Sequence, residues 1–305
     1  MKQTIFFLAI LTLIISSCTD DIDIHRHQKK AGLVVYAFPT NTDTFDIIVS
    51  AVFSLQSTHN ELDIEEIHSR CNQNPDSVIY CARRNENNIP AISFKSVGQH
   101  KEGDTIRIEV KAKGFHEISS TTVIPERVCL ENFSLDSTYY DGAIYAQYDL
   151  TFTDPPQKNY YALSAQSRYA DYESAVEYVD IETGLDPILR ATKLPGFTLS
   201  GTENSYEKMC IFNDRSFQDK TICLHPCILS RYASEAFKVT LYTLTPEYYN
   251  MLKSLSSQTN NDLADYGLSF IYSTYSNIEH GYGCVAAYQK STTPWMNFTK
   301  KAVEE

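Results

Sequence analysis

The sequence is poor in basic residues. Its 26 lysines and arginines stand against 38 aspartates and glutamates, which gives a formal net charge of −12 at pH 7. A surface of this sign repels the phosphates of nucleic acids and of anionic lipid headgroups. We therefore expect no nucleic-acid partner, and we expect the molecules that bind this chain to be neutral or cationic.

The sequence also lacks the local motifs of common enzymes. It contains no GxSxG, no HExxH and no phosphate-binding P-loop. His116-Glu117 has no second histidine at the spacing of a zinc protease, and residues 281–286 spell part of a dinucleotide loop ahead of a terminal strand instead of a helix. The sequence thus predicts no catalytic residues and no cofactor. An enzyme whose site assembles without a local motif stays an alternative.

Only one long hydrophobic run is present, from Ile5 to Ile15, and it is too short to cross a bilayer as a helix. A lysine at position 2 precedes it and small residues follow it. This order is typical of a secretory signal peptide, which we predict for residues 1–17. No second run approaches the length of a membrane span.

The end of this run, Ile15-Ser-Ser-Cys18, resembles the lipobox of bacterial lipoproteins. The resemblance implies that Cys18 becomes the first residue of the mature chain and carries acyl chains such as palmitate, which hold a protein to a membrane. The alternative is an ordinary cleaved signal with a cysteine nearby by chance. Thr19-Asp20-Asp21 is similar to a surface-export signal, although it also fits a solvated tether. We predict an outer-membrane location, lipid-anchored and exposed at the cell surface.

The aromatic residues favour strands, because the chain has 21 tyrosines and 15 phenylalanines but one tryptophan. Residues 32–38 and 45–52 are rich in β-branched residues, and residues 105–113 alternate apolar with polar. We predict a mainly β chain: a polar tether over 18–31, an immunoglobulin-like sandwich over 32–125, and a second β-rich domain over 126–305. Residues 54–90 are expected to be irregular, with at most a short helix at 63–69.

The second domain is expected to contain paired strands at 222–229 and 237–244, besides strands at 143–152, 160–169, 270–275 and 284–288. One amphipathic helix is predicted directly after the strand at 237–244. Thr245 is suited to its N-cap and Pro246 to its first turn, and a stop is expected within residues 256–262. We interpret its apolar stripe as core packing.

Besides Cys18 there are seven cysteines, and an exported protein is able to form disulfides. Cys71 and Cys81 flank a turn-rich segment and are a candidate disulfide, with two free thiols as the alternative. Cys223-Leu-His-Pro-Cys227 contains ligand types that suit zinc. Along an extended strand, however, these side chains spread apart, and no second ligand pair follows at a zinc-finger spacing. We therefore predict no metal site and favour a disulfide or buried free thiols.

Several tyrosines are candidates for a platform that stacks on sugars or peptides. The alternative is that they pack on sheet faces, which strand preference favours. They are Tyr139, Tyr140, Tyr160, Tyr161 and Tyr172.

A set of ordered segments carries a wider resemblance. The chain resembles a family of Bacteroidota lipoproteins catalogued as a domain of unknown function, often encoded beside TonB-dependent outer-membrane receptors. The segments are VVYAF (34–38), GDTIRIEV (103–110), TTVIP (121–125), LTFTDPPQKNYYAL (150–163), IFNDRSFQDK (211–220), LYTLTPEYYNMLKSL (241–255) and YSNIEHGYGCVAAY (275–288).

The resemblance implies a two-part β protein that accompanies a transporter at the outer membrane as a non-catalytic binding or docking partner. Two alternatives stay open. One is a surface adhesin or fimbria-associated sandwich protein, and the other is a glycan- or peptide-processing enzyme.

Overall fold

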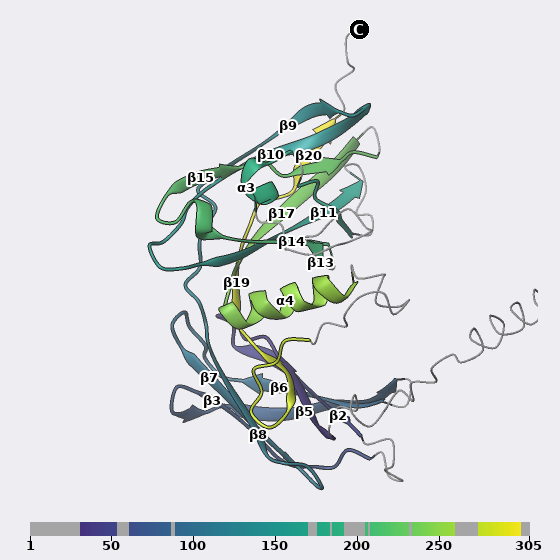
Figure 1. The fold of residues 1–305 in the computed structure, drawn as a ribbon, viewed down its shortest axis with the longest axis vertical. Coiled ribbons are helices and arrows are strands. Elements are labelled where there is room, and N and C mark those ends of the chain that lie inside the picture. Colours follow the sequence, from purple (N-terminus) through teal and green to yellow (C-terminus); the bar gives the residue numbers. More distant parts are fainter. Residues whose placement is uncertain are drawn as a thin grey trace, which may run out of the picture.

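Two β-sandwiches stacked end to end, with one helix between them, make up the computed structural model of this chain (Figure 1). It describes residues 31–53, 61–86, 89–169, 176–183, 185–191, 205–206, 208–231, 234–259 and 274–299. The predicted signal peptide and Cys18 lie outside these residues, as do the tether before residue 31 and most of the strand expected at 270–275. The prediction of a mainly β chain with few helices is confirmed.

The first sandwich consists of a five-stranded and a four-stranded sheet. Sheet A has the order β18-β1-β2-β6-β5, formed by Tyr282–Val285, Gly32–Ala37, Thr44–Val52, Ile89–Val97 and Ser77–Glu86. Sheet B has the order β4-β3-β7-β8, formed by Asn74–Pro75, Ile64–Cys71, Thr105–Ala112 and Ile118–Val123.

The alternation in β7 is what joins the two sheets of this sandwich. Ile106, Ile108 and Val110 are buried and face Leu33 and Ile47 of sheet A in one core, while the residues between them are more exposed. Each such side chain contributes roughly 1.5–3 kcal/mol on burial. The strand predicted at 105–113 is therefore confirmed, together with its buried face.

The expectation of irregular structure over 54–90 is wrong where the structure describes it. The short helix expected at 63–69 is strand β3, and β5 and β6 follow. The polar sequence of β3 reflects a wet outer face, where Glu65 and Arg70 form ion pairs with Lys111 (3.2 Å) and Glu109 (3.4 Å) of the neighbouring strand β7. Cross-strand pairs of this kind stabilise a strand that apolar periodicity does not reveal.

The second sandwich pairs a four-stranded sheet with a seven-stranded one. Sheet C contains β9 (Asn132–Tyr140), β10 (Ala143–Thr153), β15 (Thr221–Leu224) and β16 (Cys227–Leu229). Sheet D contains β13 (Ser205–Tyr206), β14 (Met209–Asn213), β11 (Tyr160–Tyr169), β17 (Ser234–Leu244), β19 (Tyr288–Thr292), β12 (Glu177–Val179) and β20 (Met296–Thr299). Two short turns of helix accompany them, α3 (Pro187–Ala191) and the 3₁₀ turn η1 (Asp214–Ser216).

The strand predicted at 222–229 is two short strands on one edge of β10. Both pair with β10. The expected pairing with residues 237–244, which belong to β17, is wrong, because β17 pairs with β11, β19 and β20. Pro226 separates them because proline has no N–H to donate to a ladder, and an edge position tolerates that loss.

Aromatic side chains fill the core between sheets C and D. Tyr148, Phe152, Tyr161 and Phe212 are fully buried. The Tyr161 hydroxyl donates a hydrogen bond to the buried carboxylate of Asp154. Burial raises the pKa of Asp154, whereas the hydrogen bond from Tyr161 lowers it by stabilising the charged form.

We expect Tyr161→Phe to lower the free energy of unfolding by about 1.5–3 kcal/mol, because it removes a donor from a buried charged group. Without that donor the pKa of Asp154 rises further, so the loss is largest at neutral pH and shrinks as acid neutralises the carboxylate. The control is Tyr249→Phe, whose hydroxyl only accepts a 3.3 Å hydrogen bond from Asn213. We expect it to cost about 1 kcal/mol or less. Urea unfolding at two pH values measures both variants, and equal losses would contradict the assignment.

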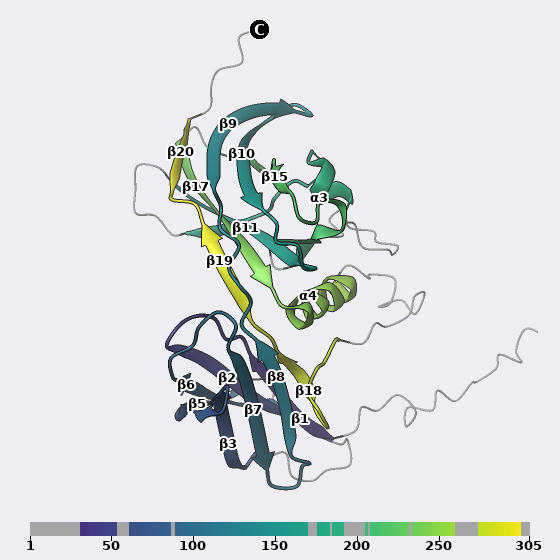
Figure 2. The same ribbon diagram turned by 90° about the vertical axis from the view of Figure 1, so that its left-hand side faces the viewer.

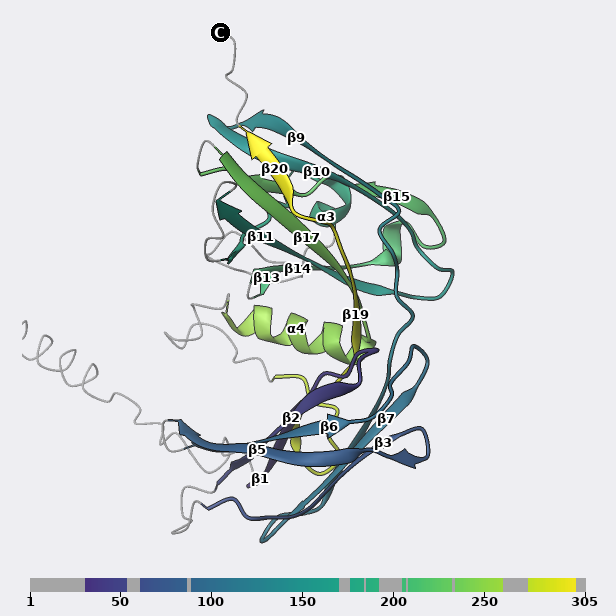
Figure 3. The ribbon, with the colours of Figure 1, turned by 180° about the vertical axis from the view of Figure 1, so that it is seen from behind.

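Helix α4 (Pro246–Thr259) begins as predicted and packs between the sandwiches (Figures 1 and 3). Thr245 Oγ accepts a hydrogen bond from the backbone N–H of Tyr248 (3.4 Å), which confirms the N-cap. The helix runs to Thr259, within the stretch 256–262 predicted for its end, and Ser256 is fully buried inside it. The apolar stripe is core, since Met251 and its neighbours Tyr249 and Leu252 cluster with residues of β11, β14 and β18.

After α4 the chain returns to the first sandwich. Strand β18 pairs in parallel with β1, and the chain then crosses back to sheet D as β19 (Figure 2). The strand predicted at 284–288 is therefore two strands, divided where Ala286 and Ala287 pass between the sandwiches. Residues from beyond position 126 thus complete the sheet that begins at residue 32.

Candidate functional site

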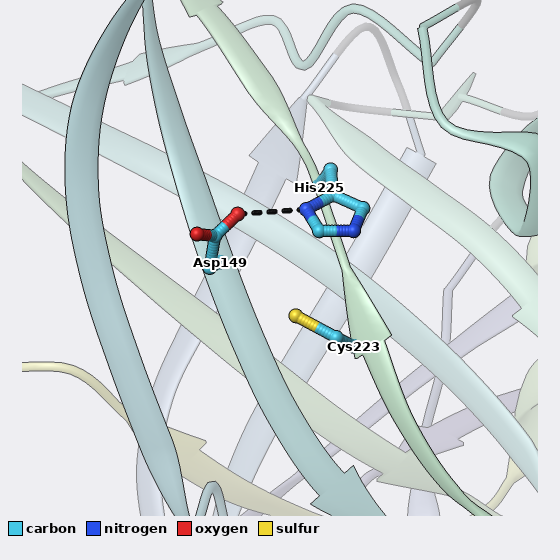
Figure 4. Close-up of side chains that lie close together, drawn as sticks. All are labelled: Asp149, Cys223 and His225. Atoms are coloured by element: carbon cyan, nitrogen blue, oxygen red, sulfur yellow. Dashed lines mark hydrogen bonds and ion pairs between the residues drawn. The ribbon is translucent and has the colours of Figure 1, made fainter.

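The outer face of sheet C brings three metal-binding residue types together. They are Asp149 on β10, Cys223 on β15 and His225 directly after β15, and one ligand atom of each lies within 4.8 Å of the others. Figure 4 shows the three side chains and the hydrogen bond between Asp149 and His225. This is a candidate metal centre in the part of the chain that the structure describes.

The pairing register explains how these residues meet. Thr151 pairs with Cys223, and beyond the break Gln147 pairs with Cys227, so the same register places His225 opposite Asp149. Side chains that are directly opposite in antiparallel strands have Cβ atoms about 4.5–5.5 Å apart. Sequence reasoning found the cysteine and the histidine but missed Asp149. Only its position on the wet face of the predicted strand 143–152 pointed to it.

The backbone around His225 is held by a buried carboxylate. The His225 N–H donates to Asp186 Oδ2 at 2.5 Å. The other carboxylate oxygen accepts from the N–H groups of Ile188 (2.7 Å) and Leu189 (3.0 Å), and so caps the short helix α3. The turn at His225 and Pro226 is thus anchored independently of the strands on either side.

The side chains of the cluster are open to solvent. His225 Nδ1 and Asp149 Oδ1 are 2.7 Å apart, and their side chains are 42% and 49% exposed. The other Asp149 oxygen accepts a 3.3 Å hydrogen bond from Ser134. Because an ionised carboxylate has no hydrogen to give, Nδ1 is the donor in the pair with Asp149. An ion pair this exposed contributes at most about 1 kcal/mol to stability.

Cys227 does not join the cluster. Its thiol is buried and lies 3.6 Å from the His225 carbonyl oxygen, to which it donates. Burial, reinforced by nearby carboxylates, raises the pKa of Cys227 to about 11, which keeps it a thiol at neutral pH. A disulfide with Cys223 is out of reach, because four residues of extended strand span about 13 Å and a disulfide joins Cα atoms less than about 7 Å apart.

The structure does not bring Cys71 and Cys81 together, since one is buried in sheet B and the other is exposed on sheet A. Cys71 ends β3 in sheet B, where its thiol is buried at 3.4 Å from Asp104 Oδ2. Burial and this neighbouring carboxylate raise the pKa of Cys71 to about 11. Cys81 is exposed at an irregularity of β5 in sheet A, and both cysteines are free thiols.

The candidate tyrosines do not form one platform. Tyr161 is fully buried, and the ring of Tyr160 packs against Tyr249 of α4 with centroids 4.7 Å apart. Tyr139 and Tyr140 are exposed at the tip of the β9–β10 hairpin. Tyr172 lies outside the described residues. The packing interpretation therefore holds for two of the four described tyrosines.

A hollow of about 400 Å³ lies where the two sandwiches meet at the start of α4. This is the volume of a small-ligand site. Two carboxylates and one ammonium group line it, together with the buried hydroxyl of Thr122, which has no hydrogen-bond partner within the described structure. The charged residues are Glu126, Glu247 and Lys158.

These features define a mainly β protein of two sandwiches, with a surface Asp-Cys-His cluster on the second. The chain belongs to the family described as Domain of unknown function (DUF4249), whose model matches residues 19–294. A comparison with curated proteins found no match. Within the described residues, no helix has both the length and the apolar character needed to span a membrane.

Proposed function

We propose that this protein is a lipoprotein of the cell envelope, anchored to the outer membrane through Cys18, and a non-catalytic docking partner of a TonB-dependent transporter. The observation that carries the anchor is the short apolar run of residues 5–15 followed by Ile15-Ser-Ser-Cys18, which resembles a lipobox. The family match covers residues 19–294 and so leaves the proposed signal peptide outside it. The TonB-dependent partner rests on the resemblance of the ordered segments.

The direction of β1 supports an arrangement for the anchored protein. The C-terminal end of β1 lies at the junction, where Phe38 stacks on Tyr248 of α4 with ring centroids 4.8 Å apart. The strand begins at Gly32, about 16 Å from its other end at 3.3 Å per residue. The tether thus joins the first sandwich at the end remote from the second, which supports an arrangement with the first sandwich nearer the membrane. A tether over 18–31 reaches at most about 50 Å when extended.

Surface chemistry favours a protein partner over direct binding to lipid. The net charge of −12 opposes adhesion to anionic headgroups. The hairpin of β9 and β10 exposes aromatic side chains on the second sandwich, with Tyr139 at 61% and Tyr140 at 51%. Tyrosine is among the residues that most often dominate binding energy at protein interfaces.

The test is co-purification from detergent-solubilised outer membranes. We expect a receptor barrel to elute with the tagged protein, and we expect Tyr139→Ser with Tyr140→Ser to lower its recovery at least about tenfold, as for a binding hot spot. The control is Tyr80→Ser, which removes a tyrosine of similar exposure (60%) from the first sandwich. Failure of the wild-type protein to retain any barrel contradicts the proposed partner. Equal losses in both variants contradict docking through the hairpin.

A further inference from the structure

We propose that Asp149, Cys223 and His225 bind a zinc ion on the outer face of sheet C. The site has three protein ligands, and its fourth position is open to water or to a donor from a bound molecule. This proposal is independent of the membrane anchor and of the transporter partner.

The donor set selects the class of metal. A thiolate and an imidazole are poor ligands for Ca²⁺ and Mg²⁺, which take oxygen donors. Zinc accepts sulfur, nitrogen and carboxylate oxygen in one site. Cu(I) favours sites built from thiolates and thioethers alone, so the carboxylate and the imidazole point to zinc.

The geometry fits with small side-chain movements. Tetrahedral zinc, with bonds of about 2.0–2.3 Å, separates its ligand atoms by roughly 3.3–3.6 Å. The ligand atoms of the cluster lie within 4.8 Å of one another, and the Asp149–His225 pair is 2.7 Å apart. Rotation about the side-chain bonds therefore has to bring the Cys223 sulfur closer by at most about 1 Å and to open the Asp149–His225 pair by less than that. Binding through Nδ1 replaces the hydrogen on that nitrogen, and the neutral imidazole then carries its proton on Nε2. The sheet backbone stays where the strand register holds it.

Neighbouring groups already orient two of the three ligands. Ser134 donates to Asp149 Oδ2 and leaves Oδ1 facing His225, while Asp186 holds the His225 backbone N–H. Groups that orient metal ligands in this way commonly change metal affinity by 10–100-fold. The half-buried Cys223 completes a set drawn from two paired strands and the residue that follows one of them, and such elements position ligands more precisely than long loops do.

The test is zinc titration of the full-length protein, purified in detergent, reduced and freed of metal by a chelator. We expect one zinc ion per chain by calorimetry, and a thiolate-to-metal charge-transfer band when cobalt(II) replaces zinc. Cys223→Ser is expected to abolish the band and to weaken zinc binding at least about a hundredfold. Asp149→Asn and His225→Ala are each expected to weaken it at least about tenfold.

Two cysteine variants serve as controls. Cys227→Ser removes a buried thiol from the same segment, and Cys129→Ser removes an exposed thiol elsewhere without disturbing the core. Both are expected to keep the zinc stoichiometry and the cobalt band, and zinc is expected to raise the unfolding midpoint only where Cys223 is intact. A wild-type protein that binds no stoichiometric zinc overturns the proposal. So does a cobalt band that survives Cys223→Ser, or one that Cys129→Ser also removes.

Discussion

Replacing Cys18 by alanine is expected to remove the protein from the outer-membrane fraction and to abolish its labelling with palmitate. The side chain of alanine has no sulfur to accept a lipid, so the precursor is expected to keep its signal peptide and to accumulate in a heavier form. Each buried methylene contributes about 0.8 kcal/mol to membrane binding, and stable anchoring needs more than one chain or a second signal. Mass spectrometry of the amino-terminal peptide and fractionation of cell envelopes measure both effects.

Cys129→Ala is the matched control, because it removes an exposed thiol from the folded body of the protein. We expect this variant to keep the palmitate label and the outer-membrane location. If the wild-type protein has an unmodified amino terminus, or if Cys18→Ala still carries label, the proposed anchor is wrong.

Replacing Gly283 by alanine is expected to detach β18 from β1 and to lower the free energy of unfolding by at least about 3 kcal/mol. Gly283 has a φ of +104°, a backbone conformation that residues with a Cβ rarely adopt. A Cβ at this position would also lie 2.0 Å from the Val35 carbonyl oxygen. The obstacle is backbone of the paired strand, so no side-chain rotation relieves it. Urea unfolding measures the loss, and hydrogen exchange at residues 34–37 reports the strand pairing.

Gly114→Ala is the control that separates backbone strain from a steric clash of the new Cβ. Gly114 also has a positive φ of +83°, but a Cβ there meets nothing within 4 Å. We expect this variant to cost about 1 kcal/mol, the usual price of a left-handed alanine. Similar losses at both positions would show that backbone strain alone acts at Gly283 and would contradict a close approach of β18 to β1.

Local chemistry predicted the elements whose signal lies within one segment. The alternation of residues 105–113 identified β7 and its buried face, and Thr245-Pro246 identified the start of α4. Strand β3 was not predicted, because its charged side chains are explained only by partners such as Lys111, on a strand some 45 residues further along the chain. A period-two pattern reports burial, and a strand with few buried residues does not produce one.

The candidate site was predicted only in part, for a similar reason. Cys223 and His225 are two residues apart, and their ligand chemistry is visible in the sequence. Asp149 joins them through the register of β10 with β15, which is set by the whole sheet. Cys223 and Cys227 do lie apart along their segment, as expected from the sequence. That expectation did not take into account that the neighbouring strand β10 supplies a third ligand, Asp149.

The return of the chain to β1 also governs the order of synthesis and folding. Residues 32–123 are synthesised well before Tyr282–Val285, so the outer edge of β1, at Val34–Ala37, has no native neighbour until those four residues have been made. A bare edge of this kind is a template for pairing with foreign strands. Chains that stop before residue 282 therefore leave this edge of the first sandwich bare, and they are the species most exposed to aggregation.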